Sequence, residues 1–237
     1  MKPHLLLLPG LLCDHASWGA VPTALADCAQ IQVADYGLAD SLTRMAEGVL
    51  RNAPERFSMA GHSMGGRVAF EILRLAPQRV DKVAILDSGH LPLAAGEAGE
   101  AEISKRMDLL KLSRSQGMRA MAAVWSANMV EPRRLQDQAL MESILQMVER
   151  KNPEIFAAQL NALIQRPDAS AQLQALTHPL LLICGRHDLH APASQHEAMQ
   201  LLAPASSLSV IEDCGHMAQM EAPQAMVDLL RQFFLDQ

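Results

Sequence analysis

Apolar and polar positions alternate along most of the chain in a repeating strand-and-helix pattern. Short continuous apolar runs, typical of strands buried on both faces, are separated by segments with apolar residues at helical spacing. The runs predict strands at residues 4–8, 30–34, 57–60, 80–86, 180–184 and 208–211. Helices are predicted at 18–29, from a cap at Asp40 or Ser41 to about 53, and at 65–75, 192–202 and 223–234. This order predicts an α/β fold with a mostly parallel sheet, helices on both faces and ligands at the carboxyl ends of the strands.

The middle of the chain breaks this pattern. Residues 89–176 contain helical segments at about 98–115, 117–128, 133–150 and 153–165, with no convincing strand. Because this block directly follows the strand that ends at Asp87, we interpret it as a lid inserted over the carboxyl edge of the sheet. The predicted organisation is a core of residues 1–88 and 177–237 with an all-helical lid at 89–176. The lid is rich in methionine, which either fills a small helical core or lines an adaptable apolar pocket.

Composition and charge limit the class of protein. A length of 237 residues, 49% of them hydrophobic and 19% charged, fits one globular domain. The net charge of −6 disfavours nucleic acid as a partner, and no apolar run approaches membrane-spanning length. The four cysteines match no zinc pattern and are expected to be free thiols in a reducing compartment.

The N-terminal leucines resemble a short signal segment. Pro9 and Gly10 interrupt this apolar run, however, and the sheet needs residues 4–8 as a central strand. We therefore expect a cytoplasmic protein.

A G-x-S-x-G motif at residues 61–65 lies between a predicted strand and a predicted helix. Strand, sharp turn and helix is the context that a nucleophile elbow requires. The turn holds Ser63 in a strained backbone conformation, and a Cβ at Gly61 or Gly65 would meet neighbouring backbone. The sequence therefore predicts Ser63 as a nucleophile raised above the sheet, with the first N–H groups of the next helix aimed at its target.

Two further loops supply a base and an acid. His216 follows the last predicted strand, and Asp188 follows the strand before it, so both reach the same sheet edge as Ser63. In this arrangement His216 takes the serine proton, while Asp188 fixes the imidazole tautomer. Asp87 is an alternative acid, because it also ends a strand. His187 and His190 flank Asp188 like metal ligands, but we favour incidental histidines beside a triad carboxylate and predict no metal site.

These motifs resemble the α/β-hydrolase superfamily, specifically its small lid-bearing, esterase-like members, over nearly the whole chain. The resemblance rests on residues 8–12 with Trp18, on 61–66, on 185–188 with Pro192, and on 215–216. In the family the first loop usually reads His-Gly, and here Pro9 replaces the histidine. The resemblance implies an oxyanion hole from the backbone N–H groups of Leu11 and Met64, with Leu12 as the alternative first donor. The family often has a hairpin before its first parallel strand. This chain begins almost at that strand, so about six strands are expected.

The site implies acyl transfer through an acyl-enzyme, with water as the second nucleophile. We predict a serine esterase that cleaves a small to medium carboxylic ester and uses no cofactor. The resemblance also admits a lactonase, a C–C bond hydrolase or an acyltransferase on the same triad. An alternative of another class is a ligand sensor on a hydrolase scaffold. Candidates for the substrate pocket are Leu12, Met121, Trp125 and Met217.

One stretch of the predicted lid is basic. Residues 105–134 hold seven basic side chains against two acidic ones, although the whole chain is acidic. Such a stretch is typical of a solvated helix face. The functional alternative is that its cations attract an anionic substrate or an acidic acyl carrier that bears the ester.

Overall fold

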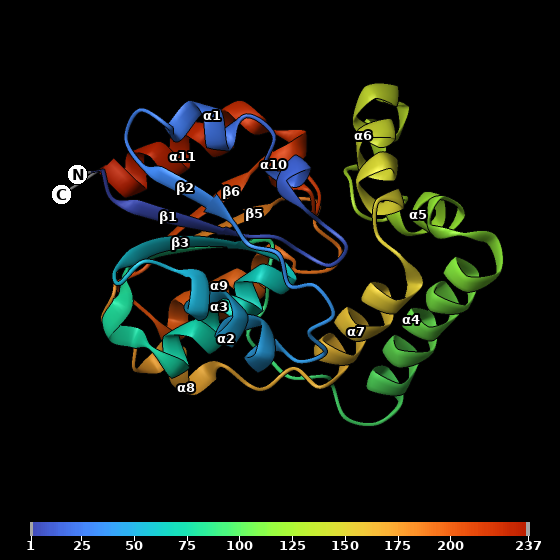
Figure 1. The fold of residues 1–237 in the computed structure, drawn as a ribbon, viewed down its shortest axis with the longest axis horizontal. Helices are drawn as coiled ribbons and strands as arrows, with labels where there is room; N and C mark the ends of the chain where they lie inside the picture. The colour runs from blue at the N-terminus through green and yellow to red at the C-terminus, as the bar shows by residue number, and fades with distance from the viewer. Residues whose placement is uncertain (1, 236–237) are drawn as a thin grey trace.

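The computed structural model describes residues 2–235, and its centre is one six-stranded sheet (Figure 1). The spatial order is β2-β1-β3-β4-β5-β6, and every neighbouring pair is parallel. The strands are β1 (His4–Leu8), β2 (Gln30–Val33), β3 (Phe57–His62), β4 (Val80–Leu86), β5 (Leu180–Gly185) and β6 (Ser207–Ile211). The predicted strand positions and the α/β fold class are confirmed. The N-terminal leucines form β1, which lies between β2 and β3.

Helices cover both faces of the sheet, which divides the apolar core in two. In Figure 1, α1, α10 and α11 lie above the sheet, while α2, α3, α8 and α9 lie below it. Leu5 and Leu7 pack toward the first group, and Leu6 and Leu8 toward the second, as the twofold alternation of a strand requires. The helices are α1 (Val21–Leu25), α2 (Leu42–Asn52), α3 (Met64–Leu75), α8 (Ser170–Gln174), α9 (Ala193–Leu202), α10 (Ala218–Glu221) and α11 (Pro223–Leu235).

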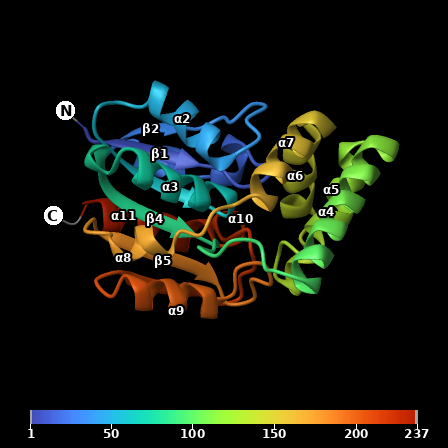
Figure 2. The same ribbon diagram turned by 90° about the horizontal axis from the view of Figure 1, so that it is seen from below.

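A separate layer of helices stands beside the carboxyl edge of the sheet. It comprises α4 (Glu97–Gln116), α5 (Met118–Ser126), α6 (Gln138–Glu149) and α7 (Pro153–Ile164), which we call the helical insertion. In Figure 2 the strand arrows point toward this layer. Local sequence signals set the ends of its helices. Gly117, with φ 88°, separates α4 from α5, and Asn152 caps α7 by accepting the Ile155 N–H at 2.8 Å.

Some elements differ from the sequence-based expectation. The helix predicted at 133–150 is a 3₁₀ turn (Pro132–Gln136) followed by α6, which Asp137 caps by accepting the Leu140 N–H at 3.1 Å. The helix predicted at 18–29 is a 3₁₀ turn (His15–Trp18) followed by the short α1, because Gly19 takes a positive φ of 49° between them. In addition, α8 lies within the segment 89–176 but contacts α3 and α9. It therefore packs with the core rather than with the helical insertion. Between residues 2 and 235, no helix is long and apolar enough to cross a membrane.

Candidate active site

The turn between β3 and α3 has the backbone conformation that the G-x-S-x-G motif predicts. Ser63 has φ 53° and ψ −115°, a strained combination for a residue with a side chain. A Cβ on Gly65 would lie 1.9 Å from the Leu8 carbonyl oxygen, and one on Gly61 would lie 2.5 Å from the Gly65 oxygen. Only glycine fits at these two positions, which is the reason the motif carries them.

Ser63, His216 and Asp188 form one continuous hydrogen-bonded chain. Ser63 Oγ lies 2.8 Å from His216 Nε2, and His216 Nδ1 lies 2.8 Å from Asp188 Oδ2. The three residues come from the ends of β3, β6 and β5, so the parallel sheet brings together side chains that are 153 and 28 positions apart. His216 and Asp188 are buried, whereas Ser63 is partly exposed.

The environment of Asp188 favours its ionised form. Burial by itself would raise the pKa of this carboxyl, but the His216 ring, together with the backbone N–H groups of Ala191 and His190, outweighs burial and lowers it. Those two N–H groups donate to Oδ1 at 3.0 and 2.7 Å, so both carboxylate oxygens have donors. The carboxylate is thus charged and oriented toward the histidine.

Asp87, the alternative acid, does not touch His216. Its Oδ1 accepts the Gly185 N–H at 2.8 Å, which ties the end of β4 to the end of β5. Burial and the nearby charge of Asp188 raise the pKa of Asp87 well above its ordinary value.

Two other histidines pack around His216. The ring of His62 lies 5.3 Å from the His216 ring and the ring of His190 lies 5.1 Å away. Burial lowers the pKa of His62 to about 3 and that of His190 to about 4, so both rings are neutral near pH 7. His62 Nε2 lies 2.7 Å from the His216 backbone oxygen and donates to it, which supports the loop that carries His216.

The loop after β1 approaches Ser63 closely. A Cβ on Gly10 would lie 3.3 Å from the Ser63 Cβ. Neither the Leu11 nor the Met64 N–H donates to an acceptor among residues 2–235. The Leu12 N–H, by contrast, donates to Gln159 Oε1 of α7 at 2.8 Å. Leu12 therefore does not serve as the alternative donor in this conformation.

The sequence analysis missed the contacts that hold the His216 loop. The N–H groups of His216 and Met217 both donate to the Met129 oxygen, at 2.9 and 3.1 Å. Glu221, buried on α10, accepts the N–H groups of Glu131, Gly215 and Met217 at 2.7, 3.0 and 3.2 Å. This carboxylate links the loop to the segment after α5. A buried glutamate five residues after the histidine carried no pattern that marked it beforehand.

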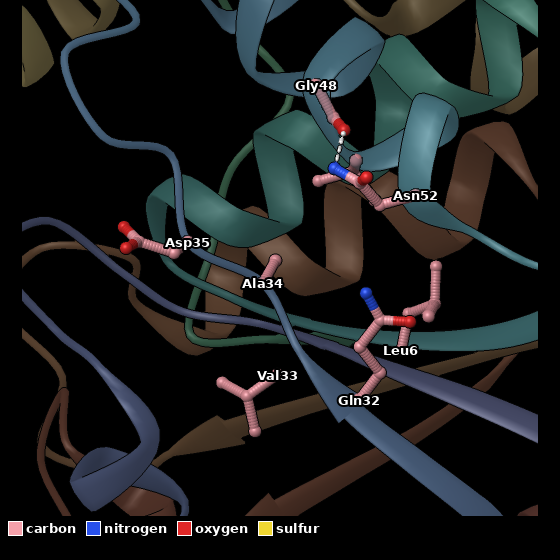
Figure 3. A pocket seen from close by; sticks show the side chains of 8 residues that line it. Leu6, Gln32, Val33, Ala34, Asp35, Gly48 and Asn52 are labelled. Carbon is pink, nitrogen blue, oxygen red and sulfur yellow. Dashed lines mark hydrogen bonds between the residues drawn. The ribbon is translucent and has the colours of Figure 1, made fainter.

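The four predicted pocket residues are all buried. Leu12, Met121, Trp125 and Met217 belong to one apolar cluster with Leu11 and Met64. Leu12, Met121 and Met217 have no exposed surface in this structure. A separate small hollow of about 50 Å³ lies between β2 and the end of α2, lined by Gln32, Asp35 and Asn52 among others, away from the triad (Figure 3).

Ion pairs neutralise much of the basic stretch. Arg106 pairs with Glu102, Arg119 with Glu142 and Glu149, Arg133 with Glu131 and Asp213, and Arg134 with Asp137. Lys105, Lys111 and Arg114, all exposed on α4, form no ion pair within the described part of the chain. In the same part of the chain, no group of three or more His, Cys, Asp or Glu side chains could hold a metal ion.

Comparison with known proteins identifies the family of the chain. A family model described as the alpha/beta hydrolase fold matches residues 23–223. The chain belongs to the α/β-hydrolase family. The resemblance seen in the sequence motifs is thereby confirmed.

Relatives of this α/β-hydrolase include ester-cleaving enzymes. The pimeloyl-[acyl-carrier protein] methyl ester esterase of Nitrosomonas europaea is 26% identical over 95% of this chain and 93% of that protein. The 2-succinyl-6-hydroxy-2,4-cyclohexadiene-1-carboxylate synthase of Citrobacter koseri is 28% identical over 98% of this chain and 93% of that protein. A thermophilic esterase from Thermogutta terrifontis shares the fold, with a TM-score of 0.87 at 24% identity over 99% of this chain and 90% of that one.

Proposed function

We propose that this protein is a serine hydrolase that cleaves a small to medium carboxylic ester. The observation that carries the proposal is the chain of two 2.8 Å contacts from Ser63 Oγ through His216 to Asp188, built on a strained elbow. A hydroxyl, an imidazole and a charged carboxylate in this order are the parts that activate a serine. The esterase named among the relatives gives the reaction class further support.

In the proposed reaction, His216 Nε2 accepts the Ser63 proton as Oγ attacks the ester carbonyl. The Leu11 and Met64 N–H groups donate to the oxyanion that forms. His216 then gives the proton to the departing alcohol, leaving an acyl group on Ser63. Water, deprotonated by His216, attacks this acyl group and releases the acid, and Ser63 recovers its proton. Asp188 stabilises the imidazolium in both halves.

The test is turnover of a short p-nitrophenyl ester by the wild type and by Ser63→Ala and His216→Ala. Each variant should lose at least about 10⁴-fold in kcat, because the groups act as a unit. For the same reason the double variant should be little worse than either single one. Binding of the ester without Ser63-dependent turnover would instead favour the ligand sensor. Lactone, C–C and acyl-acceptor substrates in the same assay distinguish the other reactions that this triad allows.

We further propose that the ester is attached to an acidic acyl-carrier protein. Two observations support it: a relative's name specifies a carrier-linked ester, and α4 exposes three cations without ion-pair partners, Lys105, Lys111 and Arg114. Because exposed charges are screened over about 10 Å at 0.1 M salt, kcat/KM for a carrier-bound ester should fall with added salt. Lys111→Gln with Arg114→Gln should lower it at low salt. Equal salt responses for carrier-bound and free esters would contradict carrier docking.

A further inference from the structure

Three arginines gather around one carboxylate where the helical insertion meets the core. Glu102 of α4 accepts hydrogen bonds from Arg106 at 2.8 Å and from Arg166 at 2.8 and 2.9 Å. Burial alone would raise the pKa of Glu102, but these two guanidinium groups outweigh burial and lower it to about 2. The single negative charge is therefore already shared between two cations.

Arg67 is the third arginine, and it has no acid of its own. Its Nη1 donates to the Leu91 carbonyl oxygen at 2.8 Å, which is a neutral acceptor. No ion pair joins Arg67 to any acidic residue in the range 2–235. Burial of the guanidinium, and then the nearby charge of Arg166, lower the pKa of Arg67 to about 9. Arg67 still carries its charge at pH 7, so the cluster has more positive charge than its own residues balance.

One member of the cluster lies on the helix that begins at the nucleophile. Arg67 is one helical turn after Ser63 on α3, about 6 Å further along the helix axis. The loop after β4 contacts both residues: Ser88 Oγ donates to the Ser63 oxygen at 2.7 Å, and the Leu91 oxygen accepts from Arg67. Within this loop, a Cβ on Gly89 would lie 3.3 Å from Arg67 Nη2. One short loop therefore holds the backbone of the nucleophile and the unpaired guanidinium in a fixed relation.

Two histidines lie near the cluster, and one of them connects it to the triad. His90, in the same loop, is buried, and its Nδ1 has no hydrogen-bond partner among the described residues. The charge of Arg106 acts on His190, whose ring lies 5.1 Å from the His216 ring. Arg106 and Glu102 are partly exposed, so the cluster is open on that side.

We propose that Arg67, with Arg106 and Arg166 behind it, binds a free carboxylate on the ester that Ser63 cleaves. The inference rests on the proposed ester hydrolysis and adds the class of substrate: an ester that bears a second, ionised carboxyl group. A guanidinium fork matches a carboxylate with two parallel hydrogen bonds, and the carboxylate supplies the charge that the cluster lacks. The carboxylate belongs either to the acyl part or to the alcohol part of the ester, and separate substrates distinguish the two.

The test compares anionic esters with neutral esters of the same length. For the acyl part the pair is p-nitrophenyl hydrogen adipate and p-nitrophenyl hexanoate. For the alcohol part it is the hexanoyl ester of p-hydroxybenzoate and that of p-hydroxybenzamide. In Arg67→Gln, the anionic-to-neutral ratio of kcat/KM should fall about 10- to 100-fold in one of the two pairs, the size expected for a hydrogen-bonded charge pair. Arg67→Lys should lose less, because it keeps the charge but not the fork.

A matched control is Arg51→Gln. Arg51 is an exposed arginine near the end of α2, just before β3 begins, so it lies at the opposite edge of the sheet. This variant should keep both ratios. Added salt gives a second test. At 0.5 M salt the wild type should keep most of its preference for the anionic ester, because salt screens an ion pair with the half-buried Arg67 only weakly. The rate with a carrier-bound ester should fall more, because carrier docking would depend on exposed lysines. Unchanged ratios for both pairs in Arg67→Gln and Arg67→Lys would overturn the subsite.

A binding measurement separates this inference from the hydrolysis on which it rests. Calorimetry with adipate, a dicarboxylate that cannot be hydrolysed, needs no turnover. Suppose that no ester is turned over, but that the wild type binds adipate and folded Arg67→Gln binds it at least about tenfold more weakly. The proposed ester hydrolysis is then wrong, and the proposed carboxylate subsite is supported. If esters are hydrolysed but adipate binds equally to both proteins, the subsite fails and the hydrolysis stands. Thermal melting of Arg67→Gln and Arg67→Lys verifies that the compared proteins are folded.

Discussion

The loops after β4 and β5 each hold a buried aspartate, and the two aspartates differ in chemistry. Asp87 directly follows β4, whereas Asp188 is the third residue after β5, and both lie near the carboxyl edge of the sheet. Asp87 accepts the Gly185 N–H and has a strongly raised pKa. Asp188 accepts two backbone N–H groups and the His216 ring, and its pKa is lowered. Burial is common to both, so the donors and charges around each carboxyl decide which one is ionised.

Glu221 shows that backbone donors alone are not sufficient. It accepts three N–H groups, yet burial still raises its pKa. Unlike Asp188, it has no histidine against its carboxylate. The contact with the His216 ring is therefore what distinguishes Asp188 from the other two buried acids of this edge.

The largest expected effect is on activity. Asp188→Asn should lower kcat/KM by about 10⁴-fold by setting the wrong imidazole tautomer. Asp87→Asn should keep most of the wild-type activity, because Asp87 does not touch His216. The measurement is ester turnover by the two variants side by side. The opposite result, an active Asp188→Asn and an inactive Asp87→Asn, would reverse the comparison.

A smaller effect is expected on stability. Glu221→Ala leaves three buried N–H groups without their acceptor and should reduce the free energy of unfolding by about 3 kcal/mol. Urea denaturation measures this loss. Glu221→Gln is the control: it keeps the shape and one acceptor oxygen, so it should cost clearly less. Equal stability of all three proteins would mean that this carboxylate does not hold the His216 loop.

The third effect is a pH dependence. Folded Asp87 keeps its proton above the pH at which an unfolded aspartate loses it, because its folded pKa is raised. The folded state then binds more protons than the unfolded one, and Asp87 makes the protein less stable as pH rises, by about 1.4 kcal/mol per pH unit at most. Asp87→Asn removes this pH-dependent loss of stability. Its stability relative to wild type should therefore increase from about pH 4 toward neutrality, as measured by denaturation at each pH. A difference that stays constant with pH would show that Asp87 is ionised in the folded state.

Much of the site at the carboxyl edge of the sheet could be predicted from the sequence alone. The elbow was predictable because its requirements are local: an apolar strand, glycines where a Cβ has no room, and a helix of regular apolar spacing. Ser63, Asp188 and His216 could be grouped because each follows a different parallel strand, and such strands end at one edge. The helix predicted at 18–29 was wrong, because the positive φ at Gly19 divides that segment.

The sequence by itself determined the α/β fold, the order of its elements and the residues that could meet at one edge, because periodicity and turn chemistry act over a few neighbouring residues. Only the tertiary structure decided which aspartate contacts His216, that Gln159 occupies the Leu12 N–H, and that Glu221 holds the His216 loop. It also decided that most of the basic stretch is paired while Arg67 is not. These outcomes depend on contacts between segments as far as 147 positions apart, and on burial, which sets the charge of each group only once the chain is packed.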